Sequence, residues 1–127
     1  MNKPIISIIG LGYVGLPLAV AFAKKYKVIG FDINQHRVNQ LKNNFDMTLE
    51  VEQEKLLQVN IADQSNFDVA QTGLFCTTNI EEIKNATVYI VTVPTPVDKN
   101  NQPDLTPLYK ASETVSNVLK KGDIVIY

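Results

Sequence analysis

The strongest constraint on the fold is a set of three glycines, Gly10, Gly12 and Gly15, in the spacing G-x-G-x-x-G. A short apolar run (5–9) precedes them and a longer one, rich in Leu and Ala (13–25), follows, which predicts a buried strand, a tight turn and a helix. The first glycine permits the turn, the second lets the backbone approach a ligand, and the third lets helix and strand pack closely. N–H groups at the helix start would face an anion such as a pyrophosphate.

The rest of the chain alternates between strand and helix patterns. Short β-branched or apolar runs predict four more strands, at 27–32, 74–78, 87–93 and 123–127. Helices are expected at 34–42, 51–59, 79–85 and 106–121. Two segments are polar or rich in proline and are expected to be loops: 60–73 and 94–104.

Helix starts are marked by side chains that can accept backbone N–H groups. Asn34 is expected to cap the helix at 34–42, and Asn79 with Glu82 forms an apparent capping box. Thr106 is expected to be an N-cap, because Pro107 then takes the first helical position.

This alternation predicts an α/β fold: a Rossmann-type, doubly wound parallel sheet with helices on both faces and strand order 3-2-1-4-5. Ligands of such sheets bind beyond the carboxyl ends of the strands. The glycine turn (10–15), Asp32 and the loop at 94–104 all follow strands, so we expect them at this edge. A chain of 127 residues is long enough for one domain, so we expect residues 1–127 to form a single domain.

Composition restricts the possible partners. Apolar residues make up 45% and charged residues 20% of a chain whose net charge is −1, which favours a soluble globular protein and gives no electrostatic case for nucleic acid or a membrane surface. The first apolar run meets Gly10 too soon for a signal peptide. The single cysteine, Cys76, fits a reducing cytoplasm, and its place in an expected strand favours a small buried residue over a nucleophile.

No residues here suggest catalysis or metal binding. His, Cys and carboxylate residues are not spaced as metal ligands, and the lone His36 lies in an expected surface helix, where we assign it no role. The chain therefore shows a cofactor site without catalytic residues.

Asp32 decides which nucleotide the turn would hold. It follows Gly10 by 22 residues, where a Rossmann half places the acid that binds the adenosine ribose. Its carboxylate can accept the 2′- and 3′-hydroxyls and would repel a 2′-phosphate, so NAD is favoured over NADP. The alternative is a solvated turn aspartate.

Arg37 complicates this choice. It could contact the adenosine, yet an arginine is also what a 2′-phosphate requires, and an exposed helical arginine can be merely structural. Thr95 is held between Pro94 and Pro96, so its hydroxyl and N–H could contact the cofactor, or the segment could simply be a stiff turn. The sequence does not decide between these roles for Arg37 and Thr95.

Three segments together resemble the UDP-glucose/GDP-mannose dehydrogenase family: 8–17 (I-I-G-L-G-Y-V-G-L-P), 31–38 (F-D-I-N…R-V) and 91–96 (V-T-V-P-T-P). The form G-x-G-Y-V-G-L-P is more selective than G-x-G-x-x-G, and the V-P-T-P loop is more selective still. Residues 46–51, with 93–98, look most like the branch that acts on UDP-N-acetylhexosamines, including the Vi-type polysaccharide enzymes. The resemblance covers essentially the whole chain.

The resemblance implies oxidation of C6 of a nucleotide sugar from alcohol to carboxylate, with two NAD⁺ and a cysteine-linked thiohemiacetal, for surface polysaccharide synthesis in the cytoplasm. By position, the backbone of Gly10, Leu11, Gly12, Tyr13, Val14 and Gly15 would hold the pyrophosphate. Asp32 and Arg37 would hold the adenosine, and Pro94 and Thr95 would lie beyond the pyrophosphate.

The family's nucleophilic cysteine, lysine and asparagine have no counterpart here, and Cys76 does not match the nucleophile. We therefore expect a truncated amino-terminal domain that binds NAD but is inactive alone, from a longer enzyme that is a homodimer and also carries dimerisation and UDP-sugar domains. Two rival readings are a hydroxyacid-type NAD dehydrogenase and a nucleotide-sensing regulatory domain, which would be complete at about this length.

Overall fold

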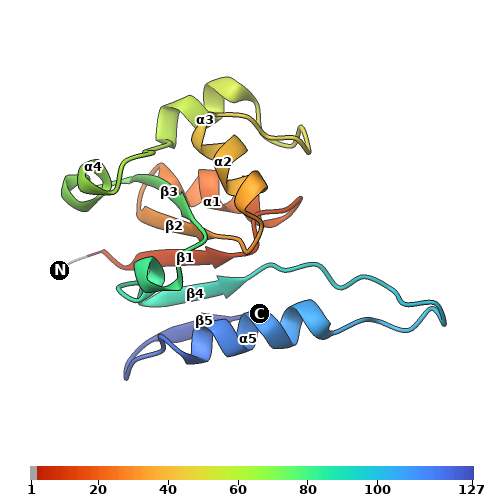
Figure 1. The fold of residues 1–127 in the computed structure, drawn as a ribbon. Helices are drawn as coiled ribbons and strands as arrows, with labels where there is room; N and C mark the ends of the chain where they lie inside the picture. Colours follow the sequence, from red (N-terminus) through yellow and green to blue (C-terminus); the bar gives the residue numbers. More distant parts are fainter. Residues whose placement is uncertain (1–2) are drawn as a thin grey trace.

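Five parallel strands form one sheet in the order β3-β2-β1-β4-β5, as Figure 1 shows. The computed structural model describes residues 3–127. The strands are β1 (Ile5–Ile9), β2 (Lys27–Phe31), β3 (Gly73–Thr77), β4 (Val88–Val91) and β5 (Ile124–Ile126). Every neighbouring pair is parallel. The predicted fold class and strand order are confirmed.

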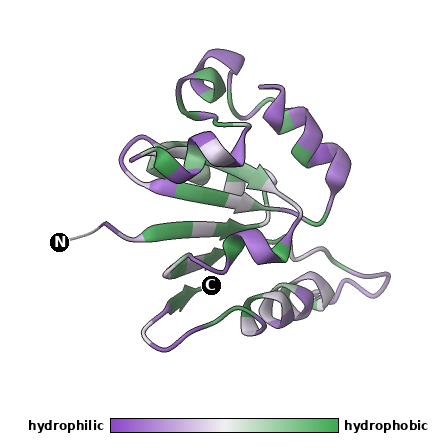
Figure 2. Ribbon diagram, turned by 60° about the vertical axis from the view of Figure 1, so that its left-hand side comes forward, coloured by the Kyte–Doolittle hydropathy of each residue, from purple (hydrophilic) through white to green (hydrophobic). Residues whose placement is uncertain are grey.

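Helices cover both faces of this sheet. They are α1 (Gly15–Ala23), α2 (Gln35–Lys42), α3 (Gln53–Val59), α4 (Gln64–Val69), the 3₁₀ helix η1 (Ile80–Ile83) and α5 (Thr106–Ser116). The core divides accordingly: α1, α2 and α3 pack on one face, and α4, η1 and α5 pack on the other. Most strand residues are apolar, and much of the strand arrows is green in Figure 2.

Alternation along the strands assigns each side chain to one of these cores. Ile6 and Ile8 of β1 pack toward α1, whereas Ile9 packs toward α5. In β3, Phe75 faces α4 while Cys76 is fully buried on the other face, as expected for a small apolar residue. The sheet needs both helical layers, because its strands carry apolar side chains on both faces.

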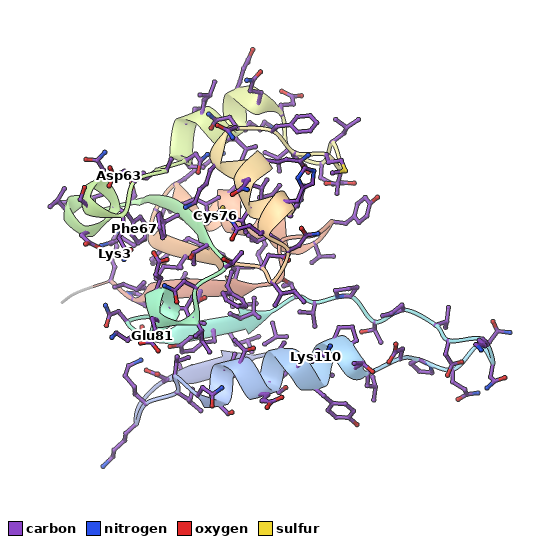
Figure 3. The ribbon with its side chains drawn as sticks, in the orientation of Figure 1. Lys3, Asp63, Phe67, Cys76, Glu81 and Lys110 are labelled. Carbon is purple, nitrogen blue, oxygen red and sulfur yellow. The ribbon has the colours of Figure 1, made fainter. Side chains whose placement is uncertain are left out.

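One expected loop is partly helical. Residues 60–73 contain α4, which begins where Asp63 accepts the N–H of Ser65 at 2.8 Å. Phe67 is buried, and its ring stacks on Phe75 with 5.5 Å between the centroids. Figure 3 labels Asp63 and Phe67 on this helix. The prediction of a loop was wrong because α4 is short and buries a single residue, Phe67, which gives no periodic signal.

Several helix ends also differ from the prediction. The helix expected at 13–25 is shorter, Gly15–Ala23, and α3 begins at Gln53, two residues later than expected. The helix expected to run to residue 121 ends at Ser116, beyond which the exposed Lys120 donates to the carbonyls of Lys84 and Ala86 at 2.6 and 2.9 Å.

Two predicted caps are wrong in detail. The N-cap of α5 is Leu105, and Asp104 accepts the Thr106 N–H at 3.0 Å, so Thr106 is already helical. Asn34 and Asn79 do cap their helices. However, Glu82 accepts the Thr77 hydroxyl at 2.8 Å and is not the reciprocal partner of Asn79, whose N–H instead bonds Thr77.

Candidate functional site

The glycine turn joins β1 to α1 and is tied to both neighbouring strands. Gly10 donates its N–H to the Phe31 carbonyl at 2.8 Å, and the Thr92 hydroxyl donates to the Gly10 carbonyl at 2.7 Å. Gly10 has φ of +102°, which residues with a side chain rarely adopt. A Cβ there would also lie only 3.0 Å from the Val93 backbone, so both the conformation and the space disfavour any other residue. A Cβ on Gly15 would overlap the Gly10 carbonyl oxygen. Close packing of α1 on β1 therefore requires both glycines.

Gly12 differs from the other two glycines. A Cβ added to it would meet no atom within 4 Å, so the fold itself does not exclude a side chain. Gly12 lines the cavity described below. Its missing side chain keeps the backbone open to a group that enters this cavity, which is the use expected of the second glycine.

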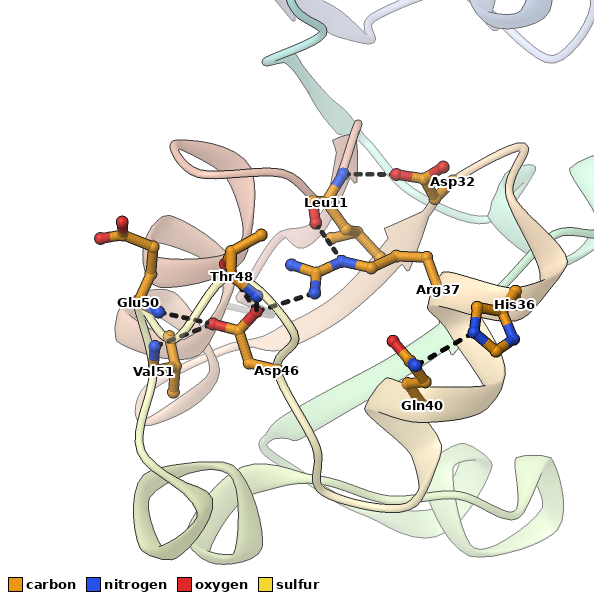
Figure 4. A network of polar contacts seen from close by, with 9 residues as sticks. All are labelled: Leu11, Asp32, His36, Arg37, Gln40, Asp46, Thr48, Glu50 and Val51. Atoms are coloured by element: carbon orange, nitrogen blue, oxygen red, sulfur yellow. Dashed lines mark hydrogen bonds and ion pairs between the residues drawn. The ribbon is translucent and has the colours of Figure 1, made fainter.

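The peptide groups on both sides of Leu11 are held by the two side chains that the sequence placed at the adenosine. Asp32 accepts the Leu11 N–H at 2.9 Å, and Arg37 Nε donates to the Leu11 carbonyl at 2.8 Å. Asp32 also accepts the N–H of Asn34 at 2.9 Å. Figure 4 shows both contacts at Leu11. The turn is thus fixed before any ligand arrives.

Arg37 is buried, whereas the sequence suggested an exposed helical arginine. Its Nη1 donates to Asp46 Oδ1 at 2.7 Å, in an ion pair whose side chains are 9% and 0% exposed (Figure 4). Its Nη2 is buried and has no hydrogen-bond partner among residues 3–127. A buried orphan donor costs free energy until a partner binds.

Asp46 organises the turn between α2 and α3. Its Oδ1 accepts the N–H and hydroxyl of Thr48 at 2.9 and 2.6 Å, and its Oδ2 accepts the N–H groups of Glu50 and Val51, both at 2.9 Å. Burial raises the pKa of Asp46, but the hydrogen bonds from Thr48, Arg37 and Val51 outweigh it and bring the pKa to about 2. Asp46 is therefore a fixed negative charge.

The reasoning from sequence did not assign Asp46 to the site. Two signals could have found it. The spacing Asp46-x-Thr48 is typical of an Asx turn, and the only arginine of the chain requires a carboxylate if it is to be buried.

A cavity of about 640 Å³ opens at the carboxyl ends of β1, β2 and β4. One wall contains the glycine turn, Asp32 and Arg37, and another is formed by α5 between Thr106 and Thr114. Figure 3 labels Lys110 on that helix. Five residues on one side of α5 line the cavity: Thr106, Pro107, Lys110, Ala111 and Thr114. No pattern in the sequence indicated this wall, since helical spacing alone does not show what a helix faces.

Six of the ten predicted site residues line this cavity: Gly10, Leu11, Gly12, Asp32, Arg37 and Pro94. Four do not: Tyr13, Val14, Gly15 and Thr95. Tyr13 and Val14 are exposed at the start of α1, Gly15 is buried in its packing against β1, and Thr95 is exposed on the loop after β4. The loop at 94–104 is irregular, as predicted. Ile33, Met47 and Thr48 are additional lining residues.

The remaining reactive side chains offer no second site. Burial raises the pKa of the Cys76 thiol to about 12, so it is not a nucleophile. His36 lies 3.1 Å from the Gln40 amide, although it also borders the cavity. Among residues 3–127 no group of three His, Cys, Asp or Glu side chains could hold a metal ion. None of the helices in this range is long and apolar enough to cross a membrane.

Comparison with known proteins identifies the family. The family model of the UDP-glucose/GDP-mannose dehydrogenase NAD-binding domain matches residues 4–127. The chain belongs to this family. Its cofactor is NAD, and the match covers its NAD-binding domain.

Several relatives lie in the branch that the sequence suggested. The chain is 52% identical over 122 residues to a UDP-N-acetyl-D-glucosamine 6-dehydrogenase of Pseudomonas aeruginosa and 51% identical over 127 residues to protein CapL of Staphylococcus aureus, covering 96% and 100% of this chain. A solved UDP-D-ManNAc dehydrogenase from Pyrococcus horikoshii superposes with a TM-score of 0.81 at 32% identity over 95% of this chain. The chain spans about a quarter of each of these proteins: 26%, 27% and 27%.

Proposed function

We propose that the cavity holds NAD⁺ and that the chain is the cofactor-binding part of a UDP-N-acetylhexosamine 6-dehydrogenase, which oxidises C6 of the sugar to the uronic acid for surface polysaccharide synthesis. Support for the substrate class comes from the identity of 51–52% with the Pseudomonas enzyme and CapL. We further propose a cytoplasmic enzyme that acts as a homodimer, and a single domain at 1–127.

The arrangement around Leu11 carries the proposal. Asp32 and Arg37 hold its peptide groups at the cavity wall, and Gly12 beside it is open to an approaching group. A pyrophosphate against the backbone of 10–15 would lie at the start of α1, where N–H groups lack intrahelical acceptors.

The other roles follow from position. Asp32 accepts only one backbone N–H on each carboxylate oxygen, so each retains a lone pair for a ribose hydroxyl. Arg37 also lines the cavity, so its side chain would contact the adenosine there. Pro94 borders the cavity, and Thr95 would reach the cofactor only through movement of the exposed loop.

NAD⁺, when bound, supplies the hydride acceptor. The residues of this chain bind and orient it, and they include no candidate nucleophile, since Cys76 is buried and its thiol pKa is about 12. The rest of the chemistry must use residues outside the region that the chain shares with its relatives.

Isothermal titration of NAD⁺ into the wild-type chain and Asp32→Ala tests the site. Loss of a charged hydrogen-bond acceptor is expected to weaken binding at least about tenfold. The matched control is Asp68→Ala, because Asp68 is an exposed aspartate on α4, remote from the cavity. Equal affinity for wild type and Asp32→Ala would exclude the role of Asp32. Formation of NADH from a UDP-N-acetylhexosamine by the 127-residue chain alone would contradict the absence of catalytic residues.

A further inference from the structure

The proposed NAD⁺ site contains a cation, Arg37, although the adenosine ribose of NAD⁺ carries no 2′-phosphate to attract it. Arg37 lies in the first turn of α2, shortly after Asp32 in the chain, and lines the cavity, where a free guanidinium would attract the 2′-phosphate of NADP. In the structure the guanidinium of Arg37 has partners within the protein. Nη1 pairs with Asp46, and Nε donates to Leu11.

We propose that Asp46 is a specificity-determining residue: it neutralises Arg37 and fixes its guanidinium against the glycine turn, so that the site rejects a 2′-phosphate. This inference rests on the proposed NAD⁺ site. Asp46 need not touch the cofactor. It acts through Arg37 and is thus a positioning residue.

The burial and the geometry of the pair support this role. The Asp46 side chain is fully buried and that of Arg37 nearly so, which strengthens their attraction compared with a surface pair. Asp46 cannot swing away, because both of its oxygens also accept bonds from the turn at Thr48, Glu50 and Val51. The pair is held rigidly from both sides.

Charge balance at the ribose end follows from this pair. With Arg37 neutralised by Asp46, Asp32 is left as the uncompensated charge at the glycine turn, and it repels a phosphate. Lys110 of α5 also lines the cavity, but it is exposed and lies on the wall formed by α5.

The same carboxylate shapes the cavity wall. Met47 and Thr48 line the cavity, and they belong to the turn whose N–H groups Asp46 accepts. Loss of Asp46 therefore has two separable effects. A looser cavity wall weakens the binding of NAD⁺ and of NADP⁺ equally. A released positive charge on Arg37 instead changes the ratio of their Kd values.

The test measures Kd for NAD⁺ and for NADP⁺ by calorimetry on the 127-residue chain and its variants. In Asp46→Asn the ratio Kd(NADP⁺)/Kd(NAD⁺) is expected to fall roughly tenfold, as one uncompensated charge near a phosphate predicts. The matched control is Asp63→Asn, since Asp63 accepts the N–H and hydroxyl of Ser65 just as Asp46 does for Thr48, but far from the cavity. In the double variant Asp46→Asn/Arg37→Gln the ratio is expected to return to the wild-type value.

A second readout needs no dinucleotide. Arg37 is the only arginine, so its Nε–Hε resonance is unambiguous. Slow solvent exchange of this proton in the wild type, with faster exchange in Asp46→Asn, supports the held guanidinium. Exchange in the wild type as fast as in free arginine overturns the proposal, even if Asp46→Asn does not fold.

The outcomes separate the two claims. If the wild type binds NAD⁺ and the ratio is unchanged in a folded Asp46→Asn, the role of Asp46 fails and the proposed function stands. If the wild type binds neither dinucleotide, the proposed site fails, and this inference fails with it.

Discussion

The hydroxyl of Thr92 donates a hydrogen bond of 2.7 Å to the carbonyl of Gly10, 82 residues earlier in the chain. Thr92 follows β4 directly, and Gly10 follows β1, its parallel neighbour. The same carbonyl lies where a Cβ of Gly15 would be. The end of β4 therefore helps to set the shape of the cofactor turn, through a side chain that no glycine motif includes.

Removal of this hydroxyl in Thr92→Val is expected to leave the Gly10 carbonyl without its partner. We expect the chain to lose about 1 kcal/mol of stability and to bind NAD⁺ more weakly, because the turn is less firmly held. Thermal unfolding and NAD⁺ titration measure the two effects. In the control Thr78→Val, which removes an exposed hydroxyl bonded to Gln35, both should stay near wild type. Unchanged stability in Thr92→Val would show that this bond contributes nothing.

The glycines at 12 and 15 are expected to respond differently to the same methyl group. Gly15→Ala forces the new Cβ into the Gly10 carbonyl and should cost roughly 1–3 kcal/mol or more. Gly12→Ala has open space for its Cβ and should unfold at nearly the wild-type denaturant concentration. Because Gly12 lines the cavity, Gly12→Ala should still weaken NAD⁺ binding.

Chemical denaturation and NAD⁺ titration of the two alanine variants separate fold from binding. A Gly12→Ala chain that is stable and binds NAD⁺ with wild-type affinity would show that the backbone at 12 does not approach the cofactor.

Asp46 should make stability depend on pH in acid. Its pKa is about 2 in the folded chain, against an ordinary value of 3.8, so the unfolded chain binds more protons between these values. The stabilisation is fully present above about pH 4 and is lost as the pH falls through 2, with a total on the order of 2 kcal/mol. Urea unfolding from pH 5 to pH 2 should show a shallower decline for Asp46→Asn than for the wild type. Parallel curves would indicate that Asp46 titrates normally.

Phe67 should anchor α4. Truncation in Phe67→Ala removes its stacking on Phe75 from a buried site and is expected to cost about 3 kcal/mol. Val69→Ala on the same helix is the control, because Val69 is 84% exposed and its loss should change stability by less than about 0.5 kcal/mol. Equal unfolding midpoints for the two variants would mean that α4 does not pack on the sheet as described.

The sequence by itself determined the parallel sheet and the glycine turn, because strands and helices follow local periodicity and Gly10 and Gly15 lie where the turn leaves no room for a side chain. The strand order was predicted as the one typical of a Rossmann-type fold, which combines this turn with alternating strands and helices. The sequence also predicted the position of Asp32 in the fold, at the end of the strand adjacent to β1, where its carboxylate meets the glycine turn.

Only the tertiary structure decided what Arg37 does. Its partners Leu11 and Asp46 lie 26 residues before it and 9 after it, and no local pattern indicates that a helix will direct an arginine inward. The same holds for the α5 wall of the cavity and for Thr92. Each depends on which distant segments the sheet brings together, and burial then changes the chemistry of the side chains: an apparently exposed cation becomes a neutralised, fixed part of the site.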